Sequence, residues 1–215
     1  MCIMMVSKKL YFVVLSVLFS FTLVGCQFTE QQQAEFNPEK AAFARLKLGL
    51  GYLAQAEESP ENIKKAHYNL NLANQYSPNN PNIMLGMALF DQHVGQYDEA
   101  DMIYRNIVKM EPMNGLYSNH YGSFLCARER YNEAKIQFKH AISLDKPKWK
   151  IDGLEQLGYC ALQNNDIKEA DQTFKQLFRY DTTAQDRVAK MADEYRQKGA
   201  VKIADYLNHL LNNAK

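Results

Sequence analysis

Histidines, cysteines and carboxylates are the side chains of this sequence that could do chemistry. Its five histidines, His67, His93, His120, His140 and His209, form no HExxH motif and no pair at metal-ligand spacing, and no cysteine accompanies them. Neither a GxSxG nucleophile motif nor a GxxxxGK phosphate loop is present. The carboxylates are spaced three or four residues from lysines, as on exposed helix faces. We therefore expect no enzyme, no metal, no cofactor and no small-molecule substrate.

The composition favours helices, and the small net charge argues against a partner that is bound mainly through charge. The 215 residues include 25 Lys or Arg and 24 Asp or Glu, so the formal charge is only +1, which argues against nucleic-acid binding. Ten Gly and six Pro are fewer than a turn-rich β protein or a low-complexity chain needs.

One cysteine has a context that predicts lipid attachment. Lys8 and Lys9 precede an apolar run from Leu10 to Val24, which is shorter than the roughly 20 residues of a permanent membrane helix. The junction Leu23-Val24-Gly25-Cys26 resembles the bacterial lipobox, in which the cysteine receives diacylglycerol and becomes the mature N-terminus. The alternative is an ordinary signal peptide that happens to contain a cysteine.

The lipobox resemblance sets the expected boundaries and the location. Residues 1–25 are expected to be a cleaved lipoprotein signal peptide, and residues 26–37 a lipidated N-terminus and flexible tether. In such lipoproteins the residue after the cysteine sorts the protein, and Gln27 implies the periplasmic face of the outer membrane, with a lipid anchor. Folding is expected to begin at Asn37-Pro38, where Asn can cap a helix and Pro fits its first turn.

A period of about 34 residues organises the rest of the chain. Short phrases ending in alanine recur at intervals of 34, 34, 36 and 34, and small residues mark a preceding helix in each period. The alanines are Ala66, Ala100, Ala134, Ala170 and Ala204. Small residues let two helices cross closely, and the pattern is that of the tetratricopeptide repeat (TPR). We expect an all-α, right-handed superhelical solenoid of about five helix-turn-helix repeats in a domain at 38–215, with repeats near 42–80, 81–114, 115–148, 151–184 and 185–215.

The repeat register places two cysteines on neighbouring helices. Cys126 and Cys160 each lie on the first helix of a repeat, and successive first helices pack side by side. A disulfide between them is therefore expected in an oxidising compartment. The alternative is a pair of buried small apolar side chains, because the different offset of each cysteine from its repeat alanine could point the thiols apart.

The same register predicts a partner-binding surface. The second, fifth, ninth, twelfth and thirteenth positions of each first helix are expected to line a concave groove, which has an apolar stretch in its N-terminal half and becomes mixed further along. The candidate residues are Phe43, Leu46, Leu50, Leu53, Leu85 and Leu89. The alternative is that some of these leucines pack against a neighbouring helix.

Three segments resemble the family of type IV pilus biogenesis/stability proteins called PilW, or PilF-type pilotins. Asn119–Cys126 (NHYGSFLC), continued by Arg130–Ala134 (RYNEA), is similar to the family segment NNYGxFLC…RYxEA. Leu154–Leu162 (LEQLGYCAL) resembles LENxGxCAL, and Ala44–Leu53 resembles ARxxLGLxYL. The chain has about five repeats, where members of the family are described with six.

The family resemblance implies a non-catalytic outer-membrane lipoprotein needed for type IV pili. Its implied partner is the pilus secretin, the outer-membrane channel, whose localisation and multimerisation it would promote. Two alternatives stay open on the sequence: a TPR scaffold lipoprotein that recruits cell-wall hydrolases or other envelope assembly factors, and an accessory of a secreted enzyme.

Overall fold

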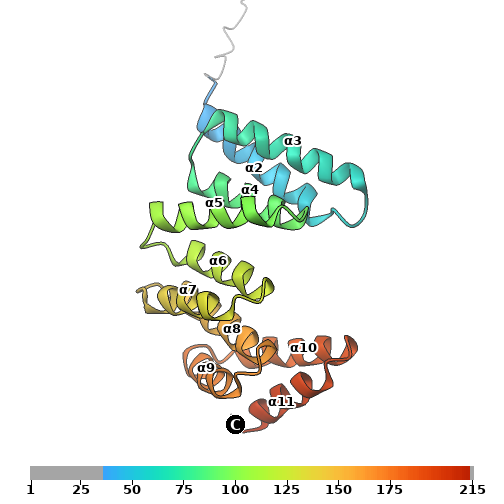
Figure 1. Ribbon diagram of the computed structural model, residues 1–215, viewed down its shortest axis with the longest axis vertical. Coiled ribbons are helices and arrows are strands. Elements are labelled where there is room, and N and C mark those ends of the chain that lie inside the picture. Colours follow the sequence, from blue (N-terminus) through green and yellow to red (C-terminus); the bar gives the residue numbers. More distant parts are fainter. Residues whose placement is uncertain (1–35, 214–215) are drawn as a thin grey trace, which may run out of the picture. The chain divides into compact units, whose positions relative to one another are not determined.

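The computed structural model describes residues 36–213, and these form ten α-helices (Figure 1). Their bounds are α2 Pro38–Ala54, α3 Pro60–Tyr76, α4 Pro81–His93, α5 Tyr97–Met110, α6 Gly115–Ala127, α7 Tyr131–Ser143, α8 Pro147–Gln163, α9 Ile167–Tyr180, α10 Ala184–Gln197 and α11 Val201–Asn212. The expected signal peptide and the expected lipid site Cys26 lie outside the described residues.

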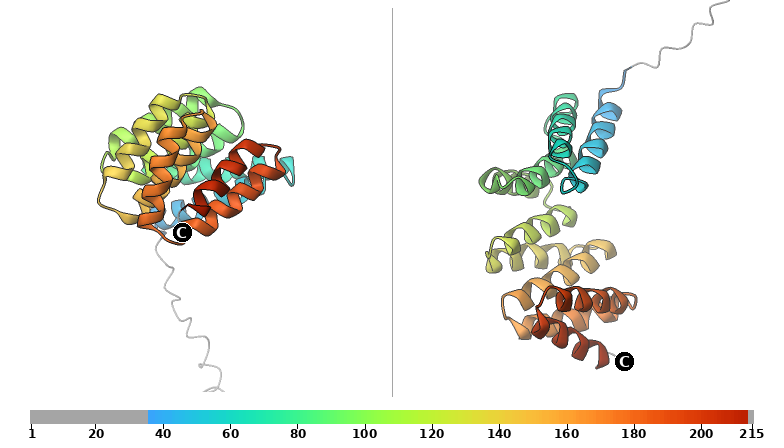
Figure 2. Two further views of the ribbon diagram at one scale, coloured as in Figure 1. Left: turned by 90° about the horizontal axis from the view of Figure 1, so that it is seen from below. Right: turned by 90° about the vertical axis from the view of Figure 1, so that its right-hand side faces the viewer.

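The ten helices pair into five hairpins within the unit Pro38–Lys215. The partners are α2 with α3, α4 with α5, α6 with α7, α8 with α9, and α10 with α11. The hairpins follow one another in chain order, with α2 and α11 at opposite ends of this unit (Figures 1 and 2). Because each hairpin contacts mainly its neighbours, this is the repeat arrangement that the 34-residue period predicts.

Local sequence signals set the helix ends. The side-chain oxygens of Ser59, Asn80 and Asp166 accept backbone N–H groups in the first turns of α3, α4 and α9. Proline occupies the first turn of α2, α3, α4 and α8. Gly95 and Gly199, in the turns of the second and fifth hairpins, have φ values of 82° and 80°, which favour glycine. The fourth hairpin begins at Pro147, four residues before the expected position, because Pro147 starts α8.

Close helix crossings occur where the period places small residues. All five repeat alanines have no exposed surface. A Cβ atom added to Gly122 or Gly158 would lie 2.7 Å from the ring of Phe138 or Phe174, respectively. These rings occupy the space that a side chain on the preceding helix would need, so the crossing distance depends on glycine there.

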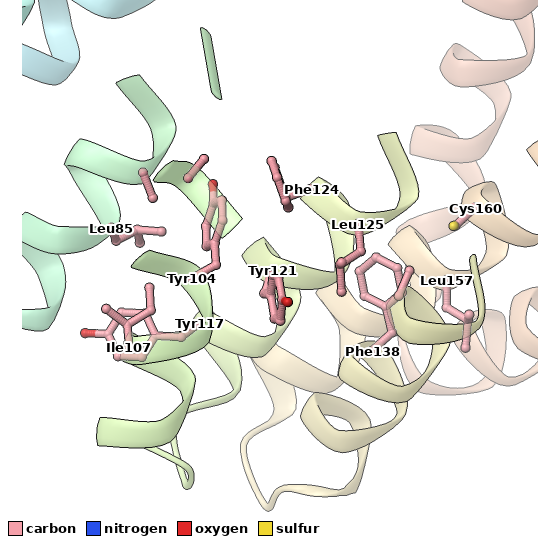
Figure 3. Packing of buried hydrophobic residues seen from close by; sticks show 13 residues of the cluster. Leu85, Tyr104, Ile107, Tyr117, Tyr121, Phe124, Leu125, Phe138, Leu157 and Cys160 are labelled. Carbon is pink, nitrogen blue, oxygen red and sulfur yellow. The ribbon is translucent and has the colours of Figure 1, made fainter. Parts of the chain in front are cut away.

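The buried side chains form three clusters along the unit. The middle cluster runs from Leu85 on α4 through Tyr104 and Tyr121 to Phe138 and Cys160 on α8 (Figure 3). Each hairpin therefore shares its core with the hairpins on either side, as in a solenoid whose single repeats cannot bury their own apolar faces.

Candidate partner-binding surface

The predicted groove residues divide into open and buried positions. Phe43 on α2 is 39% exposed, and Leu50, Leu53 and Leu89 are partly buried, with atoms at the surface. α2 and α4, which carry these four side chains, pack side by side. We call Phe43, Leu50, Leu53 and Leu89 the partner face.

The prediction is wrong for Leu46 and Leu85, each of which is only 8% exposed. A Cβ atom on Gly86 of α4 would lie 2.5 Å from Leu46 Cδ1, so Leu46 fills the contact between α2 and α4. Leu85 belongs to the middle core cluster with Tyr104 and Tyr117 (Figure 3). Both residues hold the fifth position of their repeat, counted from residues 42 and 81, and this position faces the first helix of the next repeat.

The corresponding surface in the C-terminal half is polar. Arg187 Nη2 on α10 lies 2.8 Å from Glu155 Oε2 on α8, and Gln163 Nε2 donates a hydrogen bond to Tyr195 Oη at 3.0 Å. Asn119, at the fifth position of α6, is buried and donates from Nδ2 to the backbone oxygen of Trp149 at 2.9 Å. Among the predicted groove positions, the apolar candidates that reach the surface therefore lie on α2 and α4.

The two predicted disulfide cysteines are joined in the structure. Cys126 on α6 and Cys160 on α8 have Cα atoms 6.0 Å apart and are separated by 34 residues, one repeat period. That Cα distance lies within the range that a disulfide spans. Cys160 is 2% exposed, so the bridge lies at the edge of the middle core cluster. The geometry agrees with the pairing predicted from the register, and oxidation of the pair in the cell stays a prediction.

The sequence did not predict an ionic network on the second helices of the hairpins. Asp101 on α5 accepts from Arg130 Nη1 at 2.8 Å and from Tyr121 Oη at 2.9 Å, and Arg105 Nη2 lies 2.8 Å from the same carboxylate. Burial alone would raise the pKa of Asp101, but the hydrogen bonds from Arg130 and Tyr121 lower it. Tyr121 and Arg130 stand in the quoted family segments, and their spacing from Asp101 carried no signal.

Three of the histidines, His67, His140 and His209, have packing or hydrogen-bonding partners in the described helices. His67 stacks on Phe90 with ring centroids 5.1 Å apart, and a ring nitrogen of His140 lies 2.7 Å from the backbone oxygen of Pro112. Burial lowers the pKa of His120. Within residues 36–213, no cluster of three or more His, Cys, Asp or Glu side chains has the arrangement of a metal site. The same residues contain no helix long and apolar enough to cross a bilayer.

Comparison with known proteins gives relatives of low identity. No protein-family model matches the chain. An uncharacterized protein of Haemophilus influenzae is 28% identical over 166 residues, which are 77% of this chain and 89% of that protein. The type IV pilus assembly protein PilF of Pseudomonas aeruginosa is 26% identical over 188 residues, or 86% of this chain and 73% of PilF.

Solved structures share the arrangement of the hairpins. A structure of Pseudomonas aeruginosa PilF is 25% identical, with a TM-score of 0.63 over 84% of this chain and 79% of that one. The crystal structure of PilW, described as a widely conserved type IV pilus biogenesis factor, has a TM-score of 0.60 at 19% identity, over 80% of this chain and 77% of PilW. The chain is an all-α TPR solenoid, as its repeats predict.

Proposed function

We propose that this protein is a non-catalytic lipoprotein of type IV pilus biogenesis that acts by binding another protein. The observation that carries the proposal is its similarity to PilF, which extends over 86% of the chain and is matched in fold at a TM-score of 0.63. The quoted segments on α6, α7 and α8 add to it, because they resemble the same family.

The proposed partner is the pilus secretin, and the proposed contact is the partner face. Phe43, Leu50, Leu53 and Leu89 present apolar surface on two adjacent helices, which suits an apolar helix or extended segment of a client. No comparably apolar set lies on α8 and α10, where Glu155 and Arg187 pair. This binding would promote localisation and multimerisation of the secretin.

The proposed location is the periplasmic face of the outer membrane, with the lipid on Cys26. Several acyl chains on one residue anchor a protein stably where a single chain does not. We expect palmitate labelling of the wild-type protein and loss of the label in Cys26→Ala, which would then fractionate as a soluble or mislocalised protein. An unlabelled wild-type protein would rule out the anchor.

Co-purification tests the partner and the face together. Tagged wild-type protein should retain the secretin, whereas Phe43→Glu should lose it, because a carboxylate would have to be desolvated against an apolar client. Met102→Glu is the matched control, since Met102 on α5 is 66% exposed and lies away from the partner face. Secretin retained equally by both variants would show that the client binds elsewhere.

A further inference from the structure

The first helix of the unit has a second exposed side, distinct from the partner face. α2 packs against α3 and α4, and on another side it carries a shallow hollow of about 440 Å³. The hollow is lined by Ala44, Lys47, Leu48, Gly51, Tyr52 and Gln55, which we call the open face. In later hairpins the first helix has a preceding hairpin beside it, but α2 opens the series.

The open face combines exposed apolar surface with room above it. Leu48 is 49% exposed, although the side chain is as apolar as those in the core. A Cβ atom added to Gly51 would meet no atom within 4 Å. An exposed leucine beside an uncovered glycine leaves a shallow apolar surface that another apolar surface can approach.

The charged side chain that lines the hollow, among the described residues, is basic. Lys47 lines the hollow, Lys40 lies on the same stripe of α2, one turn before Ala44, and Lys65 Nζ of α3 lies 5.5 Å from the centre of the Tyr52 ring. No carboxylate lines the hollow. Glu57 and Glu58 follow the far end of α2, so the basic part of the face is its N-terminal part.

We propose that the open face of α2 docks on the surface of a membrane that contains anionic phospholipids. Leucine and tyrosine would enter the headgroup boundary, while the lysines contact lipid phosphates, as on amphipathic helices that lie on a membrane. The orientation rests on the proposed anchor at Cys26, since residues 27–37 span at most about 40 Å between the lipid and the start of α2. Along the chain, α2 is the described helix nearest to that anchor.

A second surface hollow, on α5, has a different charge pattern. It is lined by Asp98, Asp101, Met102, Arg105, Asn106 and Lys109, so it carries both signs of charge beside an exposed methionine. An anionic membrane would meet repulsion as well as attraction there. The comparison makes Met102 and Lys109 controls for Leu48 and Lys47.

Vesicle flotation of the unlipidated protein tests the proposal without any pilus component. The protein is residues 27–215, which include the whole compact unit Pro38–Lys215 but not the lipid-bearing cysteine. We expect it to float with phosphatidylglycerol-containing vesicles, less at higher salt, and not with phosphatidylcholine vesicles. Lys47→Gln should reduce the vesicle partition coefficient by about fivefold, the effect of one surface lysine. Leu48→Glu should abolish binding, while Met102→Glu and Lys109→Gln bind as the wild type does.

The outcomes separate this proposal from the proposed function. Absence of flotation overturns membrane docking, and the open face would then be expected to bind a protein. An equal loss of vesicle binding in the α5 controls also overturns membrane docking. Phe43→Glu should still float, because Phe43 is not among the residues of the open face. Unchanged melting temperatures check that each variant is folded, and failure of secretin co-purification leaves the flotation result unaffected.

Discussion

The carboxylate of Asp101 on α5 binds the guanidinium of Arg130, the residue that precedes α7, at 2.8 Å. One repeat later the same connection occurs with the charges exchanged, because Lys135 Nζ on α7 lies 3.4 Å from Asp166 Oδ2 before α9. Lys135 follows Asp101 by 34 positions, and Asp166 follows Arg130 by 36, the spacings of the repeat alanines in those periods. Each pair ties the second helix of one hairpin to the start of the second helix in the next.

The Asp101 pair should make stability depend on pH at the acid side. Its pKa in the folded protein is below the ordinary value of 3.8, so the unfolded chain binds a proton at higher pH than the folded protein does. The stabilisation is therefore present above about pH 4 and is lost as the pH falls through the folded pKa. Urea unfolding should find Asp101→Asn less stable than wild type at pH 7, with the difference shrinking below pH 4. A difference that is constant with pH would contradict this account.

Glycine at the helix crossings should be required for stability. Gly122→Ala places a Cβ 2.7 Å from the ring of Phe138, which is fully buried, so the substitution should cost about 1–3 kcal/mol. Gly51→Ala is the control, because its Cβ meets nothing within 4 Å, and it should stabilise α2 by roughly 0.5–1 kcal/mol. Chemical denaturation measures both, and equal effects would contradict the packing argument.

The bridge between Cys126 and Cys160 should stabilise the oxidised protein. It closes a loop with a sequence separation of 34, for which chain entropy gives about 3–4 kcal/mol. Thiol titration of the denatured protein, purified without reductant, should find neither cysteine free. Two titratable thiols would show that the bridge does not form. An unchanged unfolding midpoint after reduction would show that the bridge does not stabilise the protein.

The division of the predicted groove into core and surface leads to another prediction. Leu85→Ala should lower the free energy of unfolding by about 2–5 kcal/mol, because it empties a buried site among aromatic rings. Phe43→Ala should cost much less, since Phe43 is 39% exposed. Thermal melting of the two variants measures the two losses of stability. Equal losses would show that Phe43 is a core residue and not a surface residue.

The period revealed the fold because small residues are required wherever two helices cross. Ala66, Ala100 and Ala134 are buried for that reason, so their spacing showed the hairpins directly. The sequence did not predict which of the groove leucines are buried and which reach the surface. Leu46 and Leu50 are the same residue type on one helix, and they differ in how closely they approach α4. A Cβ atom on Gly86 would lie 2.5 Å from Leu46 Cδ1 but 3.8 Å from Leu50 Cδ2.

The sequence also did not predict which long charged side chains pair with one another. Asp101 and Arg130 are 29 positions apart, and many charged pairs in the sequence have similar spacing. Which pair meets depends on how neighbouring hairpins pack, and here Tyr104 of one hairpin packs against Tyr121 and Phe124 of the next. The repeated, charge-exchanged pair becomes recognisable only after the structure gives the register.

Secretin assembly in cells shows whether this protein acts in type IV pilus biogenesis. A strain lacking this protein would be complemented with the wild type, with Phe43→Glu or with Met102→Glu, at matched expression, and the heat-resistant secretin multimers and surface pili would be measured. We expect the deletion strain to lose multimers and pili. The wild type and Met102→Glu should restore both, and Phe43→Glu should restore neither. Normal multimers and pili in the deletion strain would contradict a role in type IV pilus biogenesis.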